Sequence, residues 1–226
     1  MDGTDELTIS VIGDLANIER AAWDALANPA DQPYDPFLSW NFLRSLEESG
    51  CASAQKGWQP AHLIARDAGG AAVGAMPLYA KDHSYGEYVF DHAWADALQR
   101  AGGRYYPKLQ CAVPFTPVPG RRILSRDPAV QSALAQGAIG FAQRAGASSV
   151  HTTFAEEDLV RRLAPLGYQP RTGLQYHWFN RGYATDANAR AYLNAKPNFN
   201  TDPFQMTGMR EAVDRIRLSI QNNESI

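Results

Sequence analysis

One helix constrains the fold of this 226-residue chain more than any other segment. Residues 127–145 have the pattern of a long helix closed by Gly146, and they separate two β-rich runs at residues 108–114 and 148–154. Two strands joined through a helix of this length need a crossover connection, and they therefore pair in parallel. The sequence predicts an α/β (α+β) domain with a parallel strand pair.

Shorter elements surround that crossover. The glycines of Asp67-Ala68-Gly69-Gly70 allow the positive φ angles of a tight turn, so they predict an antiparallel hairpin. Asp14 and Ser39 are suited to cap two helices that precede the hairpin. The resulting order is β-α-α-β-β-β-α-β-α-β-β, with helices on both faces of one mixed sheet. The remaining segments are strands at residues 7–12, 60–66, 71–80 and 174–180, helices at 15–28, 40–49, 94–101 and 156–166, and a final strand partner at 168–171.

The residue pattern along the chain predicts where the domain ends. Residues 1–183 carry the ordered pattern, including an insertion at residues 81–107 in which polar and aromatic groups are crowded. Residues 184–226 are rich in Asn and Pro near their start and should be mostly loop, with one amphipathic helix at about residues 208–221. We therefore expect one domain followed by a divergent tail.

Composition excludes several classes of function. The net charge is -3 and the 21 basic residues are scattered, so we expect no DNA-binding surface. Cys51 and Cys111 lie far apart without neighbouring ligands, which argues against a disulfide framework and against a metal site. The acidic N-terminus has no export pattern and no apolar run approaches ~20 residues, so we expect no membrane span and a cytoplasmic protein.

Several aromatic-rich segments are more specific than the element order. The order resembles that of the GNAT superfamily of N-acetyltransferases. The segments resemble a bacterial family of FemAB-like proteins associated with peptidoglycan biosynthesis or recognition. The resemblance covers about residues 36–184 and rests on GWQPAHL (57–63), HSYGEYVFD (83–91), RYYPKL (104–109), VPFTP (113–117), Thr172-Gly173, His177-Trp178 and NRGY (180–183).

The resemblance implies transfer of an acyl or aminoacyl group to an amine of a small molecule or peptide. The donor would be acyl-CoA or an aminoacyl-tRNA, and no metal is implied. The family continues after Arg181-Gly182-Tyr183 into a second acyltransferase-like half, whereas this chain runs into its tail. The alternative function is therefore a non-catalytic recognition module, or an inactive first half of a two-domain transferase, with self-association through exposed apolar surface.

The donor site is expected in the loop before the long helix. Gly120 permits close backbone approach, and Arg121 and Arg122 can contact a pyrophosphate near a helix start. Val113 and Phe115 open the same loop and are expected to join the site. The alternative is an arginine-bearing surface turn stiffened by proline.

General-base candidates are Glu87 first, then His177, since a carboxylate or imidazole can take a proton from an amine. For Glu87 the alternative is a carboxylate that accepts hydrogen bonds from tyrosines or from Arg104. For His177 the alternative is a structural histidine in a strand. His83 and His92 are weighed in the same way.

Residues expected to contact the substrate are concentrated in the insertion. Lys108 can attract a carboxylate or phosphate, although a solvated lysine at the strand end is the favoured interpretation. If the backbone is extended at Tyr105 and Tyr106, these adjacent side chains face opposite ways and only one lines a given surface. Core packing is the alternative for the aromatic residues. The expected substrate-binding set is Tyr85, Tyr88, Asp91, Tyr105 and Lys108.

Overall fold

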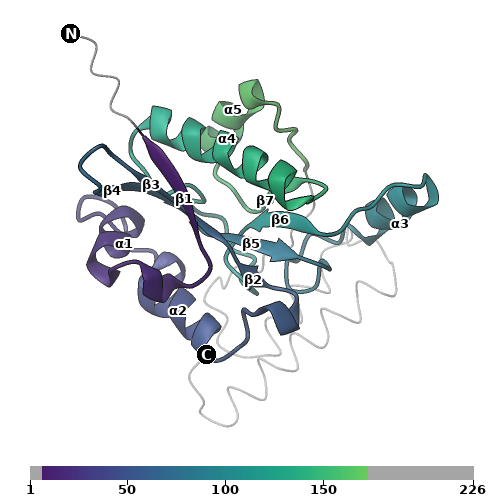
Figure 1. Ribbon diagram of the computed structural model, residues 1–226, viewed down its shortest axis with the longest axis horizontal. Coiled ribbons are helices and arrows are strands. Elements are labelled where there is room, and N and C mark those ends of the chain that lie inside the picture. Colours follow the sequence, from purple (N-terminus) through teal and green to yellow (C-terminus); the bar gives the residue numbers. More distant parts are fainter. Residues whose placement is uncertain (1–6, 173–226) are drawn as a thin grey trace, which may run out of the picture. The chain divides into compact units, whose positions relative to one another are not determined.

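A computed structural model describes residues 7–172 (Figure 1). The predicted strand at 174–180, His177, the domain boundary at 183 and the tail helix lie outside these residues. The described strands are β1 (Thr8–Ile12), β2 (Gln59–Pro60), β3 (His62–Arg66), β4 (Ala72–Met76), β5 (Leu78–Lys81), β6 (Lys108–Cys111) and β7 (Val150–Thr152). The α-helices are α1 (Arg20–Ala27), α2 (Trp40–Glu48), α3 (His92–Arg100), α4 (Pro128–Ala145) and α5 (Glu157–Leu163).

The predicted crossover is confirmed. Helix α4 begins where the side chain of Asp127 accepts a hydrogen bond from the Ala129 amide at 2.7 Å. Strands β6 and β7, on either side of it in the chain, pair in parallel, with Leu109 opposite Val150. A long helix between two short strands thus sets the direction of the pair, as its length requires.

The strands form two hydrogen-bonded sheets, and the prediction of one continuous strand at residues 71–80 is wrong. Pro77 interrupts that run: β4 stays with β3 and β1, whereas β5 joins β2, β6 and β7. Proline has no amide hydrogen to donate to a strand ladder, so a break at this position is physically reasonable. The Leu78 amide, just past the break, donates to Nδ1 of His62 at 3.1 Å.

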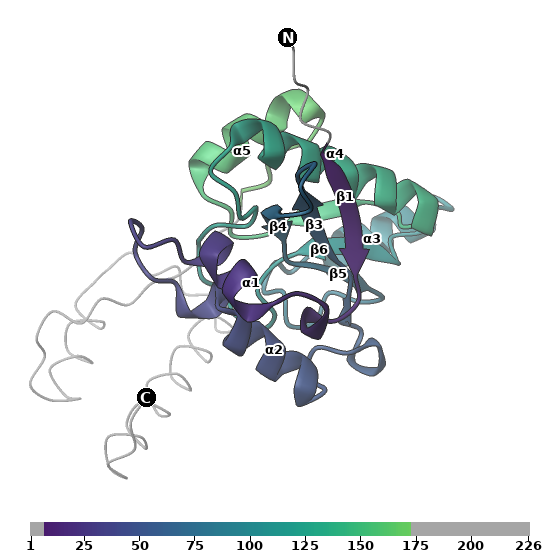
Figure 2. The same ribbon diagram turned by 60° about the vertical axis from the view of Figure 1, so that its left-hand side comes forward.

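Helices cover both faces of the sheets, as predicted (Figure 2). On one face α4 and α5 supply Leu134 and Leu159 to a core shared with Leu109 of β6. On the other face Trp23 of α1 and Leu43 of α2 pack in a second core. Residues 7–172 therefore have a mixed α/β fold of three layers.

The helix expected at residues 15–28 is shorter than predicted. Leu15–Asn17 form a single 3₁₀ turn, and α1 begins only at Arg20. The Leu15 amide donates to Glu47 Oε2 of α2 at 2.9 Å, and Ile18 has an extended backbone with φ -133°. The long-range bond to α2 competes with a continuous helix. Residues 168–171, at the other end of the described part, form no strand.

The insertion between β5 and β6 carries the elements that matter for the site. Its helix α3 projects from the rest of the domain (Figure 1) and has no buried residue. Phe90 and Trp94 are 80% and 62% exposed. The base of the insertion, in contrast, is buried: Ser84, Glu87 and Asp91 lie against the sheet. Polar contacts at this base must therefore hold the insertion in place.

Candidate functional site

Strand β6 has one apolar face and one polar face, because successive side chains alternate. Leu109 and Cys111 point into the core beneath α4. Lys108 and Gln110 point the opposite way, yet both are fully buried. The register of the neighbouring strand sets Lys81 of β5 opposite Lys108, which brings two buried lysines side by side.

Lys108 is the centre of a buried ionic cluster. Its Nζ atom donates to Ser84 Oγ at 2.8 Å, Glu87 Oε2 at 2.7 Å and Asp91 Oδ2 at 2.8 Å. The side chains of Lys108, Glu87 and Asp91 have no exposed surface. We name this group the Lys108 cluster; it consists of Lys108, Ser84, Glu87, Asp91 and Lys81. Its two ammonium groups and two carboxylates have a net formal charge of zero.

Lys81 occupies the side of the cluster nearest Trp58. Its Nζ atom lies 3.6 Å from the centre of the Trp58 ring and donates to the backbone oxygen of Tyr85 at 3.2 Å. The same atom is 3.9 Å from Glu87 Oε1, so it reinforces the charge of Lys108 without forming a hydrogen bond to that carboxylate. An ammonium held over an indole ring gains a cation–π attraction.

The cluster shifts the pKa of three of its members. Burial lowers the pKa of Lys81 to about 8, although Glu87 opposes the shift. Burial likewise raises the pKa of Glu87, with Lys108 opposing it. Burial alone would raise the pKa of Asp91. Hydrogen bonds from Lys108, Ser84 and Tyr105 outweigh that effect and hold this pKa far below its usual range. Asp91 is therefore the firmly ionised carboxylate of the cluster.

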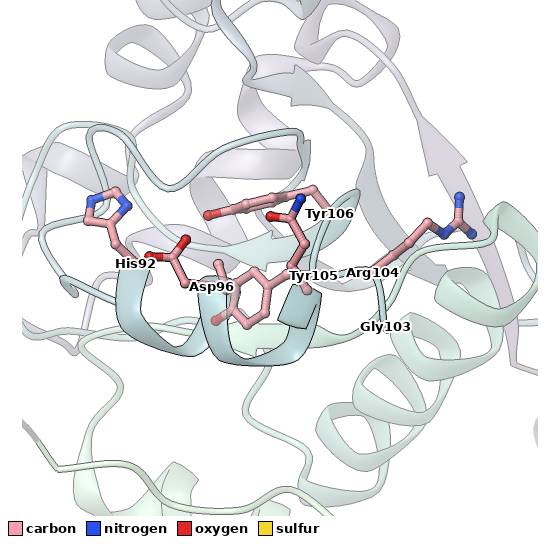
Figure 3. A pocket seen from close by; sticks show the side chains of 8 residues that line it. His92, Asp96, Gly103, Arg104, Tyr105 and Tyr106 are labelled. Carbon is pink, nitrogen blue, oxygen red and sulfur yellow. The ribbon is translucent and has the colours of Figure 1, made fainter. Parts of the chain in front are cut away.

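Two adjacent tyrosines connect the cluster to an open pocket. Tyr105 donates its hydroxyl hydrogen to Asp91 Oδ2 at 2.7 Å, and the hydroxyls of Tyr106 and Ser84 are 2.8 Å apart. Both rings line a pocket of about 420 Å³ beside α3 (Figure 3). We name it the tyrosine pocket; its lining is His92, Ala95, Asp96, Gln99, Gly103, Arg104, Tyr105 and Tyr106.

The expectation that only one of these two tyrosines lines a given surface is wrong. Residues 102–106 belong to no strand, so the alternation of side chains along an extended strand does not apply to them. The rings of Tyr105 and Tyr106 instead meet edge to face, with centroids 5.0 Å apart.

A second pocket, of about 260 Å³, lies beside the start of α4. It contains the predicted Arg121 and Arg122, and it adds Arg126 and Arg162. This arginine pocket is also lined by Leu26, Pro29, Gln32, Ile123, Leu124, Ser125, Pro128, Gln131, Glu156 and Leu159. The lining has four guanidinium groups and one carboxylate, and Asp31 outside the lining pairs with Arg126. The remaining excess of positive charge favours an anionic ligand.

The arginines of this pocket differ in whether their guanidinium groups already have partners within the protein. Arg122 is buried, and its guanidinium donates to the backbone oxygens of Thr153, Arg121 and Val118 at 2.7, 3.0 and 2.6 Å. Arg121 donates to Gln32 Oε1 at 2.6 Å. Arg162 has no hydrogen-bond or ion-pair partner within residues 7–172. Its guanidinium is thus the one best placed to receive a ligand.

The backbone at the start of α4 offers few donors. The Asp127 carboxylate already accepts from Ala129, and Pro128 has no amide hydrogen. The Gly120 amide, predicted for the donor, donates to the backbone oxygen of Phe154 at 3.0 Å. Arginine side chains, rather than the helix terminus, therefore supply the positive character of this pocket.

The sequence profile of the FemAB-like family, described as peptidoglycan biosynthesis/recognition, matches residues 14–198. The chain belongs to the FemAB-like family. A 46-residue stretch is also 46% identical to the single-stranded-DNA-specific exonuclease RecJ of Bacillus subtilis (strain 168). That stretch is 20% of this chain and spans only 6% of the length of RecJ.

Solved structures similar to this FemAB-like chain include several acetyltransferases. One, from Trypanosoma brucei, is 11% identical, with 77% of this chain and 100% of that chain covered and a TM-score of 0.42. Aminoglycoside N-acetyltransferase AAC(6')-Iy in complex with CoA is 12% identical, with 80% and 99% covered and a TM-score of 0.44. AAC(6')-Ih of Acinetobacter baumannii is 14% identical, with 78% and 100% covered and a TM-score of 0.42.

The structure brings four of the predicted site residues of this FemAB-like domain together: Glu87, Asp91, Tyr105 and Lys108. The favoured interpretation of Lys108 as a solvated lysine is wrong, since the insertion folds over it. The alternative for Glu87 is also corrected, because its carboxylate pairs with Lys108 rather than with tyrosines or Arg104.

The other predicted residues lie elsewhere. Tyr85 and Tyr88 are exposed, and Tyr85 reaches the cluster only through its backbone oxygen. Val113 is buried in the core on the α1 face. Phe115 has a left-handed backbone with φ 60°, and its ring packs 5.4 Å from that of Trp58. His177 lies outside the described residues.

Sequence reasoning missed Lys81, Asp96 and His151. Lys81 had a visible signal, because a charged residue ends an otherwise apolar strand. His151 of β7 packs its ring 5.8 Å from Tyr105, and burial lowers its pKa to about 4. Residues 7–172 contain no group of three or more His, Cys, Asp or Glu that could hold a metal ion. In the same range no helix is long and apolar enough to cross a membrane.

Proposed function

We propose that this FemAB-like protein transfers an acyl or aminoacyl group from a phosphate-bearing donor to an amine. The observation that carries the proposal is the arginine pocket beside α4, in a chain that belongs to a family associated with peptidoglycan biosynthesis. Acyl-CoA and aminoacyl-tRNA both carry phosphates in the same molecule as the acyl group. The unpaired guanidinium of Arg162 supplies charge-assisted contacts to such a phosphate, whereas Arg126 is paired with Asp31.

The chemistry needs an amine nitrogen at the carbonyl carbon of the donor. A C–N bond forms while the C–S bond of a thioester, or the C–O bond of an aminoacyl ester, breaks. The nitrogen gives up a proton to a base, and the leaving group departs as a thiol or a hydroxyl. His92 lines the open tyrosine pocket and can accept that proton. Glu87 is fully buried against Lys108, so in this proposal it positions the insertion.

The test is calorimetric titration with acetyl-CoA, longer acyl-CoAs and an aminoacyl-tRNA. Arg162→Gln should weaken binding of the active donor about tenfold, equivalent to about 1.4 kcal/mol. Arg161→Gln is the matched control, since Arg161 pairs on α5 with Glu157 and Asp158 outside the pocket. If none of these donors binds, or if both variants lose affinity equally, the donor site is refuted.

A second function, recognition without turnover, is favoured by a specific observation. The Arg122 guanidinium, the Gly120 amide and the first turn of α4 are all engaged within the fold. A domain built in this way can bind a cell-wall peptide or glycan without processing it. Ligand binding with no detectable acyl transfer from any donor would support this function over the transferase.

A further inference from the structure

Large apolar side chains are exposed together on the insertion between β5 and β6. Among the described residues nine large hydrophobic side chains are exposed, and five of them lie within residues 85–98. Helix α3, which carries two of the five, projects from the domain (Figure 1) and contains no buried residue. Exposed apolar surface concentrated in this way marks an interaction site. We name it the insertion surface; it consists of Tyr85, Tyr88, Phe90, Trp94 and Leu98.

The backbone is strained where two of these side chains are exposed. Tyr88 and Phe90 have left-handed backbones, with φ of 59° and 49°. Bulky residues rarely adopt this conformation, because it is energetically costly for them. Glycine would remove the strain, yet the chain has aromatic rings at both positions, 50% and 80% exposed. Rings that contribute so little to the core point to a role at the surface.

Buried contacts on either side hold this strained backbone in place. Glu87 and Asp91, which flank residues 88–90, both accept hydrogen bonds from the Lys108 ammonium, at 2.7 and 2.8 Å. Their side chains have no exposed surface. With both ends of the segment fixed by the Lys108 cluster, the rings of Tyr88 and Phe90 are presented to the outside. Backbone strain maintained by a buried network is typical of functional surfaces.

The charges around the insertion surface determine which partner fits it. Arg171 places a guanidinium 4.7 Å from the Trp94 ring centre, and that ring is still 62% exposed. Within residues 81–107 the exposed charges are two of each sign: Asp82, Asp96, Arg100 and Arg104. A surface with both signs is complementary to a copy of itself, because a two-fold axis can bring the carboxylates of one chain to the guanidinium groups of the other. An anionic bilayer or a nucleic acid would instead require a basic cluster.

The size of the insertion surface also fits self-association. Aromatic side chains bury about 150–250 Å² each, so the five partly exposed side chains offer roughly 500 Å². The exposed alanines of α3 and the charges around it extend this area toward the ~800 Å² per partner of a standard interface. We propose that two copies of this chain associate through their insertion surfaces about a two-fold axis, with Phe90 and Trp94 at the centre. This association goes beyond the proposed transfer reaction and requires neither donor nor acceptor.

The experiment is static light scattering of the full chain over a concentration series, and the mass of a dimer is expected at the upper end. Phe90→Ser and Trp94→Ser should each weaken dimerisation at least about tenfold, because central aromatic residues contribute most of the affinity of an interface. Tyr34→Ser is the matched control: Tyr34 is 69% exposed outside the insertion, so its replacement should leave the dimer unchanged.

Phe90→Gly separates this role from a purely structural one. Glycine adopts a φ of 49° without strain, so the urea midpoint, measured at a concentration where the chain is monomeric, should rise while dimerisation is lost. A lower midpoint would show that the Phe90 ring stabilises the fold, and it would overturn the inference.

Three further results would also overturn it. The first is the mass of a single chain at every concentration. The second is an equal effect of Phe90→Ser and Tyr34→Ser on the dimer. The third is binding of the wild type to vesicles of phosphatidylglycerol and phosphatidylcholine that Phe90→Ser abolishes, since this would assign the insertion surface to a membrane.

Discussion

Replacing Lys108 by methionine leaves two buried carboxylates without their shared ammonium. The Nζ atom makes three hydrogen bonds of 2.7 to 2.8 Å, two of them to ionised groups. Removing one partner from a buried ion pair costs about 3–5 kcal/mol, because the remaining charge is desolvated and unpaired. Lys81, 3.9 Å from Glu87, compensates part of the loss, so we expect about 3–4 kcal/mol within that range.

Urea unfolding followed by circular dichroism measures this change. Lys56→Met is the matched control: Lys56 is exposed in a 3₁₀ turn, so its replacement should stay within about 0.5 kcal/mol. The double variant Lys108→Met with Asp91→Asn should recover part of the stability, since an amide carries no charge to desolvate. A Lys108→Met loss no larger than that of Lys56→Met would refute the claim that the cluster holds the insertion on the sheet.

Two further predictions concern the same region. Gly86→Ala should destabilise more than Gly102→Ala by about 1–3 kcal/mol in urea unfolding: both residues have positive φ, but a Cβ on Gly86 would lie 2.6 Å from a phenylalanine ring and one on Gly102 meets open space. Equal losses would contradict this reasoning. Burial lowers the pKa of His151 from the ordinary 6.5 to about 4 in the folded protein, so as the pH falls the unfolded chain takes up a proton on this residue before the folded one does. Its contribution to stability is present above pH 6.5 and is lost as the pH falls toward 4. The wild type should therefore lose more stability over this window than His151→Gln, and parallel pH profiles would contradict the assignment.

The crossover around α4 was predictable because connection length and strand direction are linked by simple geometry. The break at Pro77 was not anticipated, although proline marks it. An apolar run reports burial, but it does not report which strand each half pairs with. The first half, β4, pairs with its hairpin neighbour β3, but the second half, β5, pairs with β6, which lies beyond the insertion in the chain.

The candidate site likewise depends on contacts between residues that are distant in the chain, which the sequence does not reveal. Residue type placed Glu87, Asp91 and Lys108 among the candidates, but their contacts span 17 to 24 residues. No local spacing rule reaches that far. Knowing that Lys108 is buried requires knowing that the insertion folds back over β6, and this depends on the contacts that Lys108 itself makes.

The two chemically opposite faces of β6 also determine how the chain can misfold. A slip of one residue against β5 would turn the Lys108 ammonium toward Leu134 and the other side chains beneath α4, and would press Leu109 against two carboxylates. Each of these two contacts is energetically unfavourable, so the shifted register is destabilised on both faces of the sheet. The ionic cluster thus discriminates among alignments in a way that an evenly apolar strand of the same length would not.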